Sequence, residues 1–374
     1  MSACSLAAHA ALQNKKRKIG TQIVEGKYPE PTEILPVTEE EVAGIRPRPS
    51  VLVKEQDSGG NFIRQDNLFN TPFGEGANPV EKGRYRLIWA KGCNWSNRVS
   101  IVRELLGLED VISVNLVGRT RAEVDYGWEF IYDEGHRDPV LGVRFLSELY
   151  ENTLPGFPGR ATVPSLVDVT TKTVANNDYH HLTNYLEVDF APFHKPGAAN
   201  LYPESLREEI DKLNVWLFHN INNGVYKIQF ATSYRAYQNA YDSFYAALDI
   251  LEERLSSKRF LFGDYITDSD VRLYVTLARL DTAYGQNLGP MKGRLVDYPN
   301  LWGYARDLWQ IPAFQNNTYF YDFSRSFAPA SERKGAFRTF TDRFLDEIDF
   351  DALWGSPHGR QAKSADPANK FLTV

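Results

Sequence analysis

The chain has 374 residues, a formal net charge of −6 and an ordinary globular composition. It is long enough for two domains that each bury a core. The acidic balance, without a basic stripe interleaved with aromatic residues, argues against a nucleic-acid partner and favours small molecules.

The chain has only two cysteines, Cys4 and Cys93. No disulfide framework can therefore hold the fold together, which suits a reducing cytoplasm. No apolar run reaches the roughly 18 residues of a membrane helix. The apolar stretch 5–12 precedes the basic stretch 15–18, the reverse of the order in a signal peptide. We therefore expect a cytoplasmic protein with no membrane partner.

Residues 1–80 contain many charges, prolines and glycines and show little sustained periodicity. This pattern is typical of an extended N-terminal arm rather than of a domain.

The next segment, 84–108, predicts a strand, a tight turn and a helix. Residues 85–90 are mostly apolar, and the helical spacing that follows is carried by Trp95, Val99, Val102 and Leu106. Cys93 lies between the strand and the helix. Residues 111–117 form a second apolar strand, so the segment predicts a βαβ unit with parallel strands.

The position of Cys93 predicts a nucleophile. Unpaired N–H groups and the positive end of the helix dipole favour an anion at a helix N-terminus, so a thiol held there ionises more easily. Ser96 stands where a C-x-x-C motif has its second cysteine. A mixed disulfide on Cys93 would therefore need a second, external thiol. The alternative is that Cys93 is a small buried apolar residue.

Residues 118–160 are irregular apart from a helical stretch at 141–150. Pro164 then opens an apolar strand, where its missing N–H is tolerated. If the Val163–Pro164 bond is cis, the Val163 N–H and C=O are free for a ligand. A short strand at 173–175 follows, and Asp178 stands as an N-cap before a helix at 179–186.

Beyond Pro203 the pattern becomes helical, with apolar residues at three- and four-residue spacings in 204–222, 234–255, 269–284 and 300–309. Thr267 and Asp270 form a capping box, and Ile266 and Val271 form a hydrophobic staple across it. The last stretch, 328–374, is polar with a few aromatic residues, namely Phe337, Phe340 and Phe344. It is expected to pack on the helical domain or on another subunit.

This order of features resembles a cytosolic glutathione transferase. The segments GCNWSNR, GRATVPSLVD and RFLFGDYITDSDVRLYVTLARLD are similar to those of the Xi class, the glutathionyl-hydroquinone reductases, and the similarity spans about residues 84–326. It implies an α/β plus all-α fold: a thioredoxin-like thiol-binding domain at 81–195, a helical domain at 200–327 and a C-terminal extension at 328–374.

By this resemblance, Cys93 attacks the sulfur of a glutathionylated hydroquinone, and a second glutathione reduces the resulting disulfide. Tyr226 matches a tyrosine that transfers a proton, and Tyr284 one that stabilises the thiolate. The thiol-binding positions would be Trp128, Arg160, Ala161, Thr162, Val163, Asp178 and Tyr179. Arg160 suits a carboxylate and Asp178 an α-ammonium. The substrates would be aromatic or quinone conjugates, and the protein would be a homodimer.

The sequence also departs from the family pattern. Asn94 replaces a proline, Asn97 a histidine, and Asp178-Tyr179 a Glu-Ser pair. Because these changes cluster at the thiol site, a different low-molecular-weight thiol, such as mycothiol, is an alternative to glutathione. A conjugating transferase and a non-enzymatic thiol-binding protein are the other readings. No motif for a metal site, nucleotide loop or serine nucleophile is present, so no metal is expected.

Overall fold

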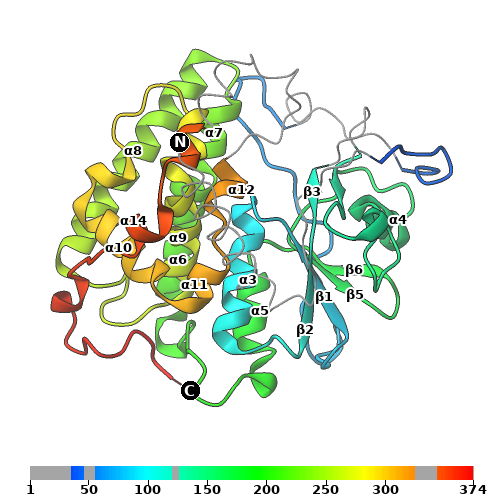
Figure 1. Cartoon of the computed structure of the whole chain (residues 1–374), viewed down its shortest axis with the longest axis horizontal. Helices are drawn as coiled ribbons and strands as arrows, with labels where there is room; N and C mark the ends of the chain where they lie inside the picture. The colour runs from blue at the N-terminus through cyan, green and yellow to red at the C-terminus, as the bar shows by residue number, and fades with distance from the viewer. Residues whose placement is uncertain (1–34, 46–54, 120–125, 325–342, 374) are drawn as a thin grey trace, which may run out of the picture.

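The computed structural model describes residues 35–45, 55–119, 126–324 and 343–373. A unit built on a small β-sheet is followed by a larger all-helical unit (Figure 1). The predicted fold class, a thioredoxin-like domain followed by a helical glutathione-transferase domain, is confirmed. The structure does not test the proposed domain boundaries, which stay predictions.

The sheet has the strand order β2-β1-β5-β6. Its strands are β1 (Tyr85–Trp89), β2 (Ile112–Leu116), β5 (Ser165–Asp168) and β6 (Thr173–Asn176). β1 and β2 are parallel, as predicted from the helix that connects them, while β5 runs antiparallel to both β1 and β6. The Val163–Pro164 peptide bond just before β5 is cis.

Helices cover both faces of this sheet. α3 (Asn94–Leu106) and α5 (Leu182–Val188) lie between the sheet and the helical unit, and α4 (Leu146–Thr153) covers the other face (Figure 1). Successive side chains of β1 therefore enter different cores: Leu87 belongs to the core shared with the helical unit, and Ile88 to the core under α4. Because both faces are buried, the strand is apolar rather than alternating, except at Arg86, whose guanidinium pairs with Asp138 at 2.8 Å.

Two predicted helices in this unit begin later than the periodicity indicated. The helix predicted at 141–150 starts only at Leu146, because the Glu148 carboxylate accepts the Arg144 and Phe145 N–H groups and fixes the helix start there. The helix predicted at 179–186 is a turn up to His181 and is helical from Leu182. Asp178 therefore caps a turn, since its carboxylate accepts the His180 N–H at 2.9 Å.

A short ribbon within the stretch predicted to be irregular was missed. β3 (Gly118–Arg119) pairs antiparallel with β4 (Trp128–Glu129), and Arg119 lies directly opposite Trp128. Two-residue strands are too short to show a periodicity, so this pairing could not be predicted from the sequence.

The helical unit contains two predicted helices close to their expected bounds, α8 (Tyr234–Ser257) and α10 (Pro299–Trp309). The stretch predicted as one helix at 204–222 is α6 (Arg207–Leu217) followed by a π-helix, Phe218–Asn222. The helix predicted at 269–284 is α9 (Asp268–Leu280), and Tyr284 begins a separate 3-10 turn, Tyr284–Gln286. Shorter helices complete the unit: α7 (Gly224–Phe230), α11 (Pro312–Asn316) and α12 (Phe320–Ser324).

The predicted capping box at the start of α9 is confirmed. Thr267 donates its N–H and its hydroxyl to one Asp270 oxygen, at 2.8 and 2.9 Å. The other Asp270 oxygen accepts the Leu261 N–H and the Tyr304 hydroxyl. Asp270 is fully buried, so this one carboxylate connects three segments of the helical core.

The described part of the C-terminal segment packs on the helical unit of the same chain. Phe350 of α14 (Phe350–Trp354) stacks on Phe320, and Arg360 is buried with its guanidinium on the carbonyls of Leu255 and Arg259. Of the three aromatic residues singled out from the sequence, Phe344 is exposed, while Phe337 and Phe340 lie outside the described residues.

The described arm residues 55–67 run across both units. Gln56 donates to the Phe230 carbonyl, and the Gly60 carbonyl accepts the Thr232 N–H, so this stretch is attached to the helical unit. Gln65 exchanges hydrogen bonds with the backbone of Arg160 in the sheet-containing unit. The arm therefore bridges the boundary at which a site between the two units would lie.

Candidate active site

Cys93 is the N-cap residue of α3. Its N–H bonds to the Ala90 carbonyl at 2.9 Å, which closes the tight turn after β1, and its φ and ψ of −87° and 118° are extended. The side chain is partly exposed, and its sulfur lies 3.6 Å from the Val163 carbonyl oxygen. The thiol is therefore held at a helix N-terminus. It is not a small buried apolar residue, which was the alternative reading of the sequence.

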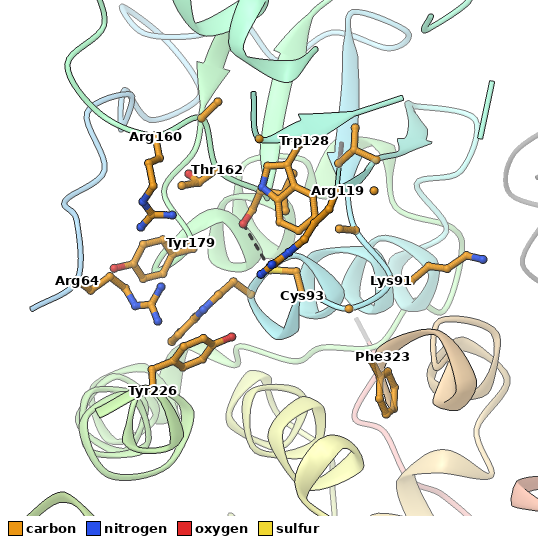
Figure 2. A pocket seen from close by; sticks show the side chains of 18 of the residues that line it. Arg64, Lys91, Cys93, Arg119, Trp128, Arg160, Thr162, Tyr179, Tyr226 and Phe323 are labelled. Carbon is orange, nitrogen blue, oxygen red and sulfur yellow. Dashed lines mark hydrogen bonds between the residues drawn. The ribbon is translucent and has the colours of Figure 1, made fainter. Parts of the chain in front are cut away.

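The sulfur faces a cavity of about 400 Å³ between the two units. This volume is within the range of small-ligand pockets. Figure 2 shows Trp128 and Arg119 on one side of Cys93 and Arg64 and Tyr226 on the other. The pairing of β3 with β4 explains why Arg119 and Trp128 reach the cavity together.

The predicted thiol-binding segment 160–163 lines this cavity, as does Trp128. The Thr162 carbonyl is used within the protein, because it accepts the Tyr150 and Ser165 hydroxyls. Val163 has its carbonyl against the Cys93 sulfur, and none of the hydrogen bonds found among the described residues uses its N–H. Ala161 contributes only its small side chain and backbone.

Arg160, predicted to bind a carboxylate, already has one. Its guanidinium lies 2.6 and 2.7 Å from the two oxygens of Glu55, which is 4% exposed. The same Glu55 carboxylate accepts the Gln65 N–H. The positive charge of Arg160 is therefore offset inside the protein by a residue of the arm.

Asp178, predicted to bind an α-ammonium group, is likewise occupied. Its carboxylate accepts from Asn67, from the His180 N–H and from the His181 ring, and it does not line the cavity. Burial alone would raise the pKa of Asp178, but the hydrogen bond and charge of His181 outweigh this, so the pKa lies below its usual value. Its neighbour Tyr179 does line the cavity and packs on Trp95 at a centroid distance of 5.0 Å.

Tyr226 and Tyr284, predicted as the catalytic tyrosines, meet behind the cavity. Their hydroxyl oxygens are 3.4 Å apart. Tyr226 lines the cavity, whereas Tyr284 does not. Burial and the charge of the Cys93 sulfur raise the pKa of Tyr226, and burial raises the pKa of Tyr284 well above its usual value. Both phenols are therefore protonated at neutral pH.

Residues of the arm form one wall of the cavity, and no pattern in the sequence predicted them there. Arg64 is the central one: its guanidinium carbon lies 4.6 Å from the Trp95 ring centroid and 4.5 Å from that of Tyr226, within cation–π range. Its Nε donates to Asn223 at 2.9 Å. The wall is completed by Glu55, Phe62, Gln65 and Asn67.

Other cavity residues were also missed. Lys91 lies on the lining with its ammonium paired to Asp322 at 3.0 Å. Arg119 is exposed and lines the same cavity. Phe323 lies on the wall of the cavity opposite Arg64.

The described residues include no group of three or more histidine, cysteine, aspartate or glutamate side chains placed to hold a metal ion. Within the same ranges, no helix is both long and apolar enough to cross a membrane.

The family model for the glutathione S-transferase C-terminal domain matches residues 235–307. The glutathionyl-hydroquinone reductase YqjG of Escherichia coli is 34% identical over 274 residues, which cover 71% of this chain and 83% of that protein. Its glutathione-bound structure superposes with a TM-score of 0.65, at 32% identity over 79% of this chain and 96% of that chain.

A Xi-class glutathione transferase from Phanerochaete chrysosporium has a TM-score of 0.67, at 32% identity over 78% of this chain and 92% of that chain. The fold and the cysteine-bearing cavity between the two units define a glutathione transferase. The chain belongs to the Xi class of that superfamily, the glutathionyl-hydroquinone reductase family.

Proposed function

We propose that this protein is a thiol-dependent reductase that removes a low-molecular-weight thiol from S-conjugated hydroquinones through a mixed disulfide on Cys93. The observation that carries the proposal is the partly exposed Cys93 sulfur at the N-terminus of α3, facing a cavity of about 400 Å³. The curated relative named a glutathionyl-hydroquinone reductase and its glutathione-bound structure support glutathione as a co-substrate.

In the first proposed step the Cys93 thiolate attacks the sulfur of the conjugate. The new S–S bond forms as the bond between that sulfur and the aromatic carbon breaks, and the electron pair stays on the carbon. Tyr226, which lines the cavity and is held protonated by burial, gives that carbon its proton. The hydroquinone leaves, and Cys93 carries the thiol as a disulfide.

In the second step the thiolate of a free co-substrate attacks the disulfide, restores the Cys93 thiolate and leaves as a disulfide of two small thiols. The chain has no cysteine besides Cys4 and Cys93, so the proposed resolving thiol comes from solution. The backbone of Val163 would orient the bound thiol beside the sulfur.

The test is the variant Cys93→Ser, assayed for reduction of a glutathionylated hydroquinone with excess glutathione. We expect loss of activity by at least about a thousandfold with an unchanged unfolding midpoint, because the nucleophile is lost from a partly exposed position. Cys4→Ser is the matched control and should keep wild-type turnover. Reduction that persists in Cys93→Ser would contradict the proposal and favour a conjugating transferase.

We further propose that the enzyme prefers a thiol without an α-ammonium group, such as mycothiol. Three observations support this preference. Asp178 is engaged by Asn67 and His181, the only acidic side chain on the described cavity lining is Glu55, and Glu55 is paired with Arg160. An α-ammonium group entering this cavity would therefore find no free carboxylate.

Comparing turnover with glutathione and with mycothiol, each at several concentrations, tests this preference. We expect kcat/KM to be at least about tenfold higher with mycothiol, since an unpaired ammonium costs at least about 1.4 kcal/mol. Equal or higher kcat/KM with glutathione would leave the reductase proposal intact and reject the altered preference.

A homodimer and a cytoplasmic location also remain predictions. Light scattering of the purified protein and fractionation of the cells that make it would test them.

A further inference from the structure

Arg279 joins the helical unit to the loop that precedes the nucleophile. It lies at the end of α9, is 1% exposed, and does not line the cavity. Its guanidinium donates to the Lys91 carbonyl at 3.0 Å and to the Gly92 carbonyl at 3.3 Å. A further bond of 3.0 Å reaches the Asn97 side chain in the first turn of α3. The residues on both sides of Cys93 are thus held by one side chain from the other unit.

All the acceptors of Arg279 are neutral. In the described chain no carboxylate pairs with it, in contrast to Arg259 and Arg272, whose guanidinium groups lie on Asp307 and Asp268. An arginine stays protonated in a protein, and a buried cation without an anion is unfavourable. Arg103 is likewise buried on neutral acceptors, so the feature that distinguishes Arg279 is its place against the turn that leads into Cys93.

The groups whose negative charge would stabilise Arg279 are the Cys93 sulfur and the phenols of Tyr226, Tyr274 and Tyr284. Burial raises the pKa of each of these three tyrosines. The phenols are therefore neutral in the resting protein. Of these four groups, the Cys93 sulfur belongs to the residue that directly follows the Lys91–Gly92 turn held by Arg279.

We propose that Arg279 is a positioning residue that fixes the Lys91–Gly92 turn and the first turn of α3 and supplies the counter-charge for the anion on the Cys93 sulfur. The inference rests on the proposed function, because it assumes that Cys93 reacts as a thiolate. A residue of the helical unit would thus help to position and stabilise a nucleophile of the sheet-containing unit.

Other charged or titratable groups face the same region from the elements around it, and they must be kept constant in any test. They are Glu55, Arg64, Lys91, Arg98, Arg119, Tyr132, Arg160, Tyr179, Tyr226, Tyr274 and Tyr284.

The experiment compares Arg279→Gln and Arg279→Lys in a Cys4→Ser background, so that Cys93 is the only thiol. The rate of alkylation by iodoacetamide is measured from pH 5 to 10, together with reductase turnover. Arg103→Gln is the matched control, because Arg103 is a buried arginine at the far end of α3 whose acceptors, two backbone carbonyls, are also neutral. It reports the effect of losing a buried guanidinium in general.

For Arg279→Gln we expect alkylation at pH 6 to slow by at least about tenfold and to converge with the wild type near pH 10, since a nearby unit charge is lost. Arg279→Lys keeps the charge but not the fork of donors. It should keep a wild-type pH midpoint within about 0.5 unit and lose at least about tenfold in turnover. Arg103→Gln should change neither readout.

A wild-type pH profile in Arg279→Gln would overturn the counter-charge, and wild-type turnover in Arg279→Lys would overturn the positioning. If Arg279→Gln does not fold, Arg279→Lys provides the test. A shift of its alkylation midpoint by one pH unit or more would also contradict the proposal. If instead the parent protein reduces no conjugate and its Cys93 reacts no faster than a free thiol, the proposed function fails.

Discussion

At the scale of single residues, Asn94 lowers the stability of the fold. It is the first residue of α3 and 1% exposed, yet neither polar atom of its side chain has a hydrogen-bond partner in the part of the chain that the structure describes. The family resemblance places a proline at this position. Proline suits the first position of a helix, and the extended Cys93 backbone, with φ −87° and ψ 118°, is compatible with a following proline.

We predict that Asn94→Pro stabilises the fold by about 1–2 kcal/mol, because it removes two buried unpaired polar atoms and restricts the unfolded chain. Urea unfolding of the variant and of Asn94→Ala measures the change. Asn94→Ala should recover only part of the gain, and a Pro variant less stable than the wild type would show that Asn94 is needed for the turn.

His180 makes the fold sensitive to acid. Its ring packs on Tyr179 and Phe218, and burial together with the Arg98 charge lowers its pKa from 6.5 to about 3. Because its folded pKa is depressed, the unfolded chain binds the proton first as the pH falls below about 6.5. His180 therefore costs stability progressively between pH 6.5 and 3.

Between pH 7 and 4.5, His180 should cost the wild type about 3 kcal/mol of unfolding free energy. His180→Phe should not show this loss, because phenylalanine keeps the aromatic packing and does not titrate. Unfolding of both proteins at the two pH values tests this. His181 provides a comparison of opposite sign, since its hydrogen bond with Asp178 raises its pKa. Its contribution is present below pH 6.5 and disappears as the pH rises through the raised pKa. A His180→Phe protein with the wild-type acid sensitivity would exclude His180 as the cause.

At the scale of elements, the arm and the segment before β5 depend on each other. Glu55 and Arg160 form a largely buried ion pair, with side chains that are 5% and 16% exposed, and Gln65 bonds to both the N–H and the carbonyl of Arg160. Removing one partner of such a pair leaves the other charge buried and unpaired. The arm thus acts as a structural part of the cavity rather than as a tail beside it.

Replacing Glu55 by Gln should destabilise the protein by about 3 kcal/mol and free the Arg160 charge toward the cavity. We expect KM for glutathione, which carries two carboxylates, to fall relative to KM for a neutral sugar thiol. Glu75→Gln, which changes an exposed acid of the same arm, is the control and should alter neither quantity. If Glu55→Gln leaves both KM values unchanged, Arg160 does not meet the co-substrate.

At the scale of the whole molecule, the C-terminal segment belongs to the helical core. Trp354 is 4% exposed, and its ring lies 5.0 Å from that of Trp302 and 4.8 Å from that of Phe320. Its backbone carbonyl accepts a hydrogen bond from Gln310. A segment more than 40 residues beyond α10 thus closes the same core that supports α9 and Arg279.

Trp354→Ala should therefore lower the free energy of unfolding by about 3–5 kcal/mol, as expected for a large buried aromatic residue. Leu353→Ala on the same helix changes a side chain that is 43% exposed and should cost less than about 1 kcal/mol. Denaturant unfolding of the two variants would contradict this picture if their stabilities were equal.

The sequence by itself determined the local features. The apolar run of β1, the spacing of α3, the parallel connection to β2 and the capping box before α9 follow from interactions between residues close in the chain, which leave a period or a spacing to read. The position of Cys93 at the start of a helix was predicted in the same way.

Only the tertiary structure decided which groups stay free at the site. Arg160 and Asp178 looked available in the sequence, but Glu55 and Asn67, more than 100 residues earlier, occupy them. The contacts of Arg64 with Trp95 and Tyr226, and of Arg279 with the turn before Cys93, are likewise made across long stretches of chain. Such pairings depend on how separate elements pack, and packing leaves no period in the sequence because the partners are set by three-dimensional proximity alone.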